Sequence, residues 1–392
     1  MIRLSKQEHL RDGNVPATRT DGFLRNVPVC RPQVPTFANY EKYLNAIDQS
    51  GWYTNFGPLN EQLERRLASH FNLERGNVCL TSSGTAALVA ALRAVCLPGK
   101  KACLMPSWTF VATAAAAVSV GLEPHFCDVD LDTWMPCPTA VENRSDLHKF
   151  SAIIIVAPFA APVDTDRWHR VQQSTGIPVI IDAAAAFDSV SINGPMSAGP
   201  LPIVLSMHAT KTFAVGEAGV LLSGNKSLID RSRAAVNFGF HGSREAQLLG
   251  FNGKLSEIAA AVGHATLDTW PETRRAWLTA LQNYLDVIPA EMLKHFWIPG
   301  KGAYCLSTFN CRLPSVEKLK AAKAQLARQG VSTRRWWGGG CHNQFAYSNF
   351  SADPLPVTER VASTVLGLPI WQGLTTVETL LIVNTLSEVL DA

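Results

Sequence analysis

The sequence predicts an α/β fold in which a mostly parallel sheet lies between helices, followed by a smaller α+β unit. Short apolar runs alternate with helical patterns up to about residue 270, which is typical of a parallel sheet covered on both faces. Beyond Trp270 the pattern changes to a helix and short strand-like pieces. With 392 residues, 47% of them hydrophobic, the chain can form a large core in one domain or two.

The N-terminal part is expected to form an arm and then two helices. Residues 1–35 are polar, irregular and interrupted by proline, so we expect an arm rather than a core element. From Asn39 a helical spacing is marked by Tyr40, Tyr43, Leu44 and Ile47, and it ends at the turn GWYTNFGP. A second, amphipathic helix is marked by Leu59, Leu63, Leu67 and Phe71.

The sheet is expected from seven short apolar runs, each bounded by turn residues. These runs are Val78–Thr81, Ala102–Met105, Pro124–Cys127, Ala152–Val156, Val179–Ile181, Ile203–Ser206 and Val220–Leu222. Helical patterns follow several of them, at Thr85–Val95, Phe110–Val120 and Asp166–Gln173.

The C-terminal part reads as a smaller domain. A helical stretch runs to Leu285 and is followed by strand-like pieces such as Tyr304–Arg312, with further helices at Val316–Gln329 and Thr376–Leu390. We therefore predict an N-terminal arm (1–35), a large α/β domain (36–270) and a small α+β domain (271–392).

Charge and composition disfavour nucleic acids and membranes as partners. The 35 basic and 32 acidic residues give a net charge of +3, and no basic run occurs. The longest apolar stretches, Ala152–Val163 and Ala112–Leu122, are shorter than the roughly 20 residues that span a bilayer. The charged N-terminus is unlike a signal peptide. Only 17% of the residues are charged, which suggests that part of the surface is covered by a second subunit.

The nine cysteines are interpreted as small buried side chains. They form no CxxC pair and no zinc-like spacing, so no metal site is expected. Scattered cysteines of odd number in apolar contexts suit a reducing cytoplasm.

The first candidate binding element follows the first predicted strand. In parallel sheets, ligands bind beyond the carboxyl ends of the strands. Residues 81–88 (TSSGTAAL) form a turn of small residues that opens into a helix. Backbone N–H groups at such a helix start, with the Ser and Thr hydroxyls, can hold a phosphate. The alternative for this motif taken alone is an ordinary helix cap.

Two ionisable residues follow later strands. Asp182 ends the run Val179–Ile181, where a buried carboxylate needs a partner, either backbone N–H groups or a cationic ring nitrogen. Lys211 lies in the loop after Ile203–Ser206, among small residues and glycine. A partly desolvated lysine there would be a nucleophilic amine, although a single lysine is more often a surface residue.

The combination narrows the alternatives. A phosphate cradle, a carboxylate and a lysine in this order on an α/β sheet are what pyridoxal phosphate (PLP) requires. The cradle holds the phosphate, the carboxylate keeps the pyridine nitrogen protonated, and the lysine holds the aldehyde as an imine.

With these motifs, the sequence resembles the DegT/DnrJ/EryC1/StrS aminotransferases, sugar aminotransferases of the fold-type-I PLP enzymes. The resemblance extends from about Asn39 to the C-terminus and rests on six segments. These are GWYTNFGPL (51–59), SSGTAAL (82–88), PSWTF (106–110), IIDAAAAF (180–187), SMHATK (206–211) and GFNGKLSEIAAAVG (250–263).

The resemblance implies a role for particular residues. Lys211 would be the Schiff-base lysine and Asp182 the partner of the pyridine nitrogen. The phosphate would be bound by Gly84, Thr85 and Ser206. Phe110 would lie on the ring, with Trp108 as the alternative. Asn252 would reach the cofactor phosphate of a neighbouring subunit, so the resemblance implies a homodimer with shared active sites.

Two departures from the family pattern stand out. Ala185 occupies the position where the family usually has Gln or His bonding the ring hydroxyl, and Phe187-Asp188 stand where it often has His-Gly. Losing the hydroxyl contact would weaken cofactor orientation by about 1 kcal/mol.

The resemblance implies transamination in two halves. An amino donor, glutamate by family analogy, would convert the cofactor to pyridoxamine phosphate, and a keto-sugar, typically nucleotide-linked, would then accept the nitrogen. Residues placed to meet such a sugar are Tyr53, Thr54, Asn55, His208, Arg334, Arg335, Trp336 and His342. Paired guanidinium groups suit phosphates and Trp suits a base or sugar face, although a solvated loop explains 334–337 equally. We interpret His208 as a packed or cofactor-side residue.

Three alternatives stay open from the sequence. The acceptor could be a cyclitol or another ketone, or the chain could bind PLP as a regulatory protein without turnover. A cofactor-free α/β protein would require every motif match to be accidental.

Overall fold

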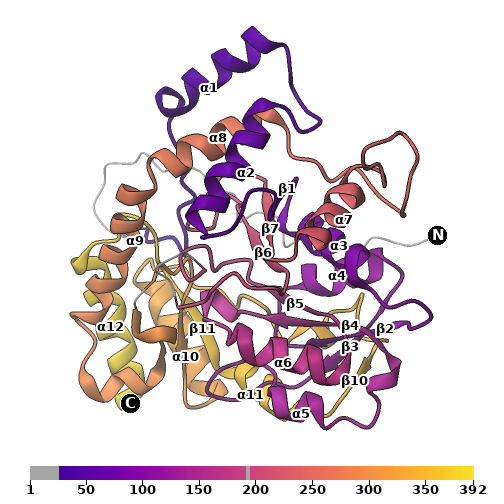
Figure 1. The fold of residues 1–392 in the computed structure, drawn as a ribbon. Helices are drawn as coiled ribbons and strands as arrows, with labels where there is room; N and C mark the ends of the chain where they lie inside the picture. The colour runs from indigo at the N-terminus through magenta and orange to yellow at the C-terminus, as the bar shows by residue number, and fades with distance from the viewer. Residues whose placement is uncertain (1–25, 191–194, 303) are drawn as a thin grey trace, which may run out of the picture.

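The computed structural model describes residues 26–190, 195–302 and 304–392. Its centre is an eight-stranded sheet in the order β1-β7-β6-β5-β4-β2-β3-β10 (Figure 1). The strands are β1 (Val78–Thr81), β2 (Ala102–Pro106), β3 (Glu123–Cys127), β4 (Phe150–Val156), β5 (Val179–Asp182), β6 (Ile203–Ser206), β7 (Gly219–Leu222) and β10 (Ser351–Ala352). β7 runs antiparallel to β1 and β6, and all other neighbours are parallel. The predicted α/β fold with a mostly parallel sheet is confirmed.

The sheet is buried on both faces, which explains why its strands read as continuous apolar runs. In β5, Val179 and Ile181 pack into the core on one face, while Ile180 packs into a second core on the other. The second core is closed by α3 (Gly84–Val95), α4 (Val111–Ser119) and α7 (Lys226–Val236). The first is closed by α2 (Pro58–His70), α6 (Thr165–Thr175), α8 (Glu257–Asp268) and α9 (Trp270–Leu285).

Helix α1 (Phe37–Ser50) lies at one end of the molecule against α8 and near α2 (Figure 1). It is mostly exposed, and Ile47 is its buried residue. Three side chains, from Lys42, Tyr43 and Arg66, converge on Asp268 of α8. The ring of Tyr43 also stacks on His264, with centroids 4.8 Å apart. Polar contacts therefore hold a helix that contributes little to the core.

The C-terminal part forms a three-stranded antiparallel sheet in the order β11-β9-β8. Its elements are β8 (Phe296–Trp297), β9 (Phe309–Arg312), α10 (Val316–Arg328), α11 (Pro356–Thr364), β11 (Val365–Leu368) and α12 (Thr376–Asp391). In Figure 1, α9 and α12 lie side by side beside this sheet. The strand-like piece predicted over Tyr304–Arg312 is a strand only from Phe309 onward.

The described end of the predicted arm takes part in the core. Val27 is fully buried, and its backbone bonds to Gly330 and Ser332 of the C-terminal part at 2.9 Å each. Arg31 lies over the ring of Trp371, 4.7 Å from its centroid. The rest of the arm, residues 1–25, lies outside the described residues.

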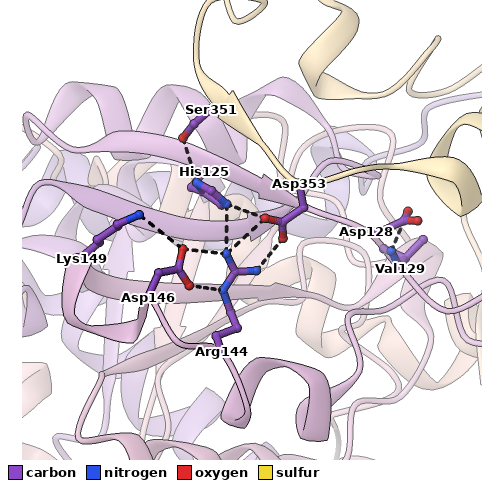
Figure 2. Close-up of polar contacts among 8 residues, drawn as sticks. All are labelled: His125, Asp128, Val129, Arg144, Asp146, Lys149, Ser351 and Asp353. Carbon is purple, nitrogen blue, oxygen red and sulfur yellow. Dashed lines mark hydrogen bonds and ion pairs between the residues drawn. The ribbon is translucent and has the colours of Figure 1, made fainter.

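One piece of the predicted small domain joins the large sheet. Strand β10 pairs with β3, and an ion-pair network secures it (Figure 2). Arg144 lies between Asp146 and Asp353, and His125 contacts both Asp353 (2.9 Å) and Ser351 (2.8 Å). A short segment of the C-terminal part is thus fixed to the edge of the eight-stranded sheet.

Within the parts of the chain that the structure describes, every helix is too short or too polar to cross a membrane.

Candidate active site

Asp182 and Lys211 meet beyond the carboxyl ends of two neighbouring strands. Asp182 is the last residue of β5 and is 6% exposed, while Lys211 follows β6 and is half-buried. The strands are parallel, with Asp182 opposite Val204, and the N–H of Ser206 donates to the carbonyl of Ala184 at 3.1 Å. The predicted acid and the predicted lysine therefore lie on the same edge of the sheet.

The environment shifts the pKa of both groups in the direction that favours the neutral form. Burial raises the pKa of the Asp182 carboxyl, and hydrogen bonds and the charge of Lys211 oppose this shift. Burial lowers the pKa of the Lys211 amine, opposed by the charge of Asp182. Each group thus responds to the charge of the other. An amine of lowered pKa beside a buried carboxylate suits nucleophilic chemistry.

The carboxylate of Asp182 is held by contacts that the sequence did not reveal. Thr113 of α4 donates its hydroxyl to Oδ2 at 2.8 Å, and the N–H of Ala184 donates to Oδ1 at 3.3 Å. Thr109 lies behind Thr113, with their hydroxyl oxygens 2.7 Å apart. Both threonines stand in the segment PSWTFVAT, where the four-residue spacing at a helix start was the available signal.

At the predicted phosphate cradle, the start of α3 packs closely against the ends of β6 and β7. A β-carbon at Gly84 would stand 2.9 Å from Cβ of Ser206, and one at Gly219 would stand 2.3 Å from the carbonyl oxygen of Ser83. Glycine at both positions lets the start of α3 approach the strand ends. Ser83 caps the helix through the N–H of Ala86 at 3.1 Å. The N–H groups of Gly84 and Thr85 belong to the first turn, which has no intrahelical acceptors.

These residues fit pyridoxal phosphate. The half-buried start of α3 offers N–H groups to an anion beside Ser206, while the buried carboxylate of Asp182 calls for a cationic partner. Lys211 brings an amine to the same edge. The sequence offered a helix cap and a phosphate cradle as alternatives, but the two are compatible. The Ser83 hydroxyl accepts from the N–H of Ala86, so the N–H groups of Gly84 and Thr85 can bind a phosphate.

The two candidate ring-stacking residues differ sharply in exposure. Phe110 is 58% exposed at the start of α4, three residues before Thr113. Trp108 is 2% exposed and packs edge-on against Trp134 and Trp337. Only Phe110 therefore presents an open face to a ligand.

His208 braces the loop that carries Lys211. Its Nδ1 accepts from the N–H of Thr210 at 3.2 Å, which places the proton of the neutral ring on Nε2. That nitrogen lies 3.6 Å from Glu217. The carbonyl of His208 accepts from the N–H of Lys211 at 2.9 Å. This geometry favours a loop-shaping role over that of an independent base.

Three residues predicted to meet the substrate, and Asn252, predicted to reach the cofactor phosphate of a neighbouring subunit, are exposed side chains. Tyr53 is 56% exposed, and Thr54 and Asn55 are exposed beside it in the loop between α1 and α2. Asn252 is exposed too, next to Gly253, whose carbonyl accepts from the N–H of Ser82 at 2.8 Å. Among the described residues, none of these side chains bonds to Asp182 or Lys211.

The C-terminal candidates divide into two groups. His342 reaches the ring-stacking segment, with Nδ1 2.6 Å from Oγ of Ser107, and burial lowers its pKa. Arg334 pairs through its backbone with Gly367 of β11 and holds its guanidinium 4.9 Å from the ring of Trp336. Arg335 donates to the carbonyl of Ala362. The segment is thus partly packed, while Arg334 stays exposed.

The departures at Phe187 and Asp188 have a structural explanation. Phe187 stacks on Phe213 with centroids 4.0 Å apart. Asp188 is 2% exposed and accepts from Nε of Arg274 in α9 at 2.7 Å and from the N–H of Cys305 at 3.0 Å. Phe187 therefore packs within the core beside the sheet, and Asp188 connects the strand-end region to α9 and to Cys305. Ala185 carries no polar side-chain atom for a ring hydroxyl.

Comparison with known proteins identifies the family of this chain. A profile of the DegT/DnrJ/EryC1/StrS aminotransferase family matches residues 37–387. Protein Rv3402c of Mycobacterium tuberculosis is 30% identical over 88% of this chain and 85% of its own length. The dTDP-4-amino-4,6-dideoxy-D-glucose transaminase of Escherichia coli is 28% identical over 89% and 95%.

Among solved structures, DesI, determined in the presence of its TDP-sugar product, superposes with a TM-score of 0.78. It is 28% identical and covers 93% of this chain and 92% of its own. The family resemblance inferred from the motifs is confirmed. The chain is a PLP-dependent aminotransferase and belongs to the DegT/DnrJ/EryC1/StrS aminotransferase family.

Proposed function

We propose that this enzyme transfers an amino group from an amino acid, glutamate by family analogy, to a keto-sugar carried on a nucleotide. The observation that carries the proposal is the meeting of Lys211, Asp182 and the open start of α3 at one sheet edge. Relatives support the acceptor class. Besides the transaminase above, one from Acidithiobacillus ferrooxidans, 26% identical over 81% of this chain, is named a UDP-N-acetyl-3-dehydro-alpha-D-glucosamine 3-aminotransferase.

The residues of the sheet edge would bind and orient the cofactor. Pyridoxal phosphate supplies an aldehyde that carries nitrogen and a ring that withdraws electrons. The N–H groups of Gly84 and Thr85 and the hydroxyl of Ser206 would bind its phosphate. Asp182 would hold a proton on the pyridine nitrogen through its carboxylate, and Phe110 would cover one face of the ring.

Lys211 would both hold the aldehyde and move protons. Because burial lowers the pKa of its amine, a larger fraction is neutral near pH 7 than for an exposed lysine. Nζ of the freed lysine would take the proton from the α-carbon of the amino donor. In the second half it would return a proton to the carbon that receives nitrogen.

The acceptor sugar would be bound by His342 and by the exposed guanidinium of Arg334. Nδ1 of His342 is held by Oγ of Ser107, and Nε2 would be the ring nitrogen that meets the sugar. Arg334 suits a phosphate of the nucleotide. Tyr53, Asn55 and Trp336 complete the proposed set.

The enzyme would work as a homodimer in the cytoplasm. Large apolar side chains are exposed on α1, on α8, on the loop after α1 and on the loop after α7. They are Phe37, Trp52, Tyr53, Phe238, Leu249 and Ile258. Figure 1 shows α1 and α8 at the top of the view, and the loop that follows α7 at the upper right. A second copy placed there would cover them and bring its Asn252 near the cofactor phosphate. Light scattering should give a dimer, and a monomer at micromolar concentration would contradict this part.

A two-step spectroscopic assay tests the function. Glutamate should convert the bound cofactor to its pyridoxamine form, and a nucleotide-linked keto-sugar should restore the starting spectrum. Mass spectrometry should find the aminated sugar. Lys211→Ala should abolish both steps while the fold is kept. An unchanged spectrum with glutamate would indicate a PLP-binding protein without turnover, and restoration only by keto-cyclitols would replace the sugar as acceptor.

A further inference from the structure

Two buried threonines form a chain of hydroxyl groups behind the carboxylate of Asp182. Thr113 is fully buried and Thr109 is 2% exposed. The hydroxyl oxygen of Thr113 lies 2.8 Å from Oδ2 of Asp182 and 2.7 Å from the hydroxyl oxygen of Thr109. The chain of hydroxyls bonds to Oδ2 of Asp182, whereas the N–H of Ala184 bonds to Oδ1.

The directions of these hydrogen bonds follow from the number of protons. An ionised carboxylate only accepts, so Thr113 donates to Asp182. A hydroxyl has one proton, and Thr113 has used its own, so Thr109 donates to Thr113. Both protons therefore point toward Asp182. Hydrogen bonds directed at a carboxylate favour its charged form.

Among the described residues, the hydroxyl of Thr113 does not bond to a carbonyl of its own helix, whereas the hydroxyls of several other helical threonines in this chain do. Such residues usually donate to the carbonyl four positions earlier. Thr364 does so to Arg360 at 2.8 Å and Thr385 to Leu381 at 2.8 Å. Thr113 donates to a side chain instead, and its N–H bonds to the carbonyl of Phe110 at 3.1 Å. One helical turn thus presents Phe110 outward and Thr113 to the acid.

We infer that Thr113, oriented by Thr109, is a positioning residue that fixes Asp182 toward the ring nitrogen and keeps it charged. The inference rests on the proposed function, in which Asp182 holds the proton on that nitrogen. Burial by itself raises the pKa of the Asp182 carboxyl and so favours its neutral form, and the hydrogen bond from Thr113 opposes this effect. Without the hydroxyl, the acid would hold the ring proton less firmly.

The decisive variant is Thr113→Val, which keeps the shape of the side chain and removes its hydroxyl. Cofactor affinity should fall by on the order of 10- to 100-fold, as for loss of one hydrogen bond to a charged group. The pH at which the visible band of the bound cofactor changes should rise, because a less firmly protonated ring withdraws fewer electrons from its linkage to lysine. Thr113→Ser should restore both values, and Thr109→Val should shift them less.

The control is Thr385→Val, at a buried threonine whose hydroxyl, among the described residues, bonds to the carbonyl of Leu381 in its own helix. It should leave cofactor affinity and the band unchanged. Wild-type values for Thr113→Val, or a Thr113→Ser variant as impaired as Thr113→Val, would overturn the inference. If Thr113→Val does not fold, Thr109→Val and Thr113→Ser test the inference instead. It requires a small change in cofactor affinity and band pH for Thr109→Val and no change for Thr113→Ser. A wild-type protein that takes up no cofactor would instead overturn the assignment of the site.

Discussion

Gly84 and Ser206 lie so close that a β-carbon at Gly84 would stand 2.9 Å from Cβ of Ser206. This contact joins the helix start after β1 to the end of β6, although a whole strand, β7, separates β1 from β6 in the sheet. The loop that carries Lys211 begins at the same serine. The contact therefore brings the phosphate cradle and the lysine to one place.

Replacing Gly84 by alanine should weaken cofactor binding. The added carbon would push α3 away from β6, and we expect a destabilisation of about 1–3 kcal/mol and a loss of cofactor affinity on the order of tenfold. A fluorescence titration of the cofactor-free protein measures the affinity. Gly199→Ala is the control, because nothing lies within 4 Å of a β-carbon there. Unchanged affinity in Gly84→Ala would contradict the assignment of the cradle.

Phe110→Ala and Trp108→Ala should have opposite effects on binding and stability. Phe110 is 58% exposed, so its loss should cost little stability but weaken cofactor binding about fivefold through lost stacking. Trp108 is 2% exposed, and its loss should cost about 4 kcal/mol of folding free energy. Cofactor titration measures the effect on binding, and urea unfolding measures the effect on stability. Phe345→Ala, at a side chain 97% exposed, should change neither. Equal cofactor affinity in Phe110→Ala and the wild type would remove Phe110 from the site.

Asp188→Asn should destabilise the protein without affecting turnover at saturating cofactor. The amide would give Arg274 and the N–H of Cys305 a weaker partner, and we expect a loss of about 2 kcal/mol in urea unfolding. Asp230→Asn is the matched control, because its pair with Lys226 lies on the surface and should contribute under about 1 kcal/mol. A large fall in turnover would mean that Asp188 acts in the chemistry.

Stability should fall as the pH drops from about 6.5 toward 4, in part through His264. Burial lowers the pKa of His264 to about 4, whereas its ordinary value is 6.5. Between these values the unfolded chain binds more protons than the folded one, so acid favours unfolding. The shift corresponds to about 3 kcal/mol. Unfolding free energies of the wild type and His264→Gln across this range should converge at low pH. A parallel decline of the two would assign the acid sensitivity to other groups.

Much of the fold could be predicted because buried strands are apolar along their length. All seven predicted strands are present, and β4 is buried at every position. The antiparallel direction of β7 could not be predicted, because periodicity does not record direction. Strand β10 was missed because Ser351 and Ala352 are exposed, and polar contacts from Asp353 and His125 hold it in place.

The site was predictable where a residue type carries the chemistry itself. Lys211, Asp182 and Gly84 stand at strand ends and helix starts, which a pattern of elements can locate. Thr109 and Thr113 were missed because a threonine in a helix start usually serves the backbone, and only the fold shows that Asp182 faces them. Asp188 was read as a departure from a family pattern, since its partner Arg274 lies 86 positions later.

The attachment point of the cofactor tests the central claim most directly. Borohydride reduction of the holoenzyme should fix the cofactor covalently to its lysine, and peptide mass mapping identifies that residue. We predict the modification on Lys211, with Lys211→Arg unlabelled and Lys254→Arg labelled like the wild type. Modification of Lys254, whose pKa is also lowered by burial, or of any lysine other than Lys211, would contradict the account.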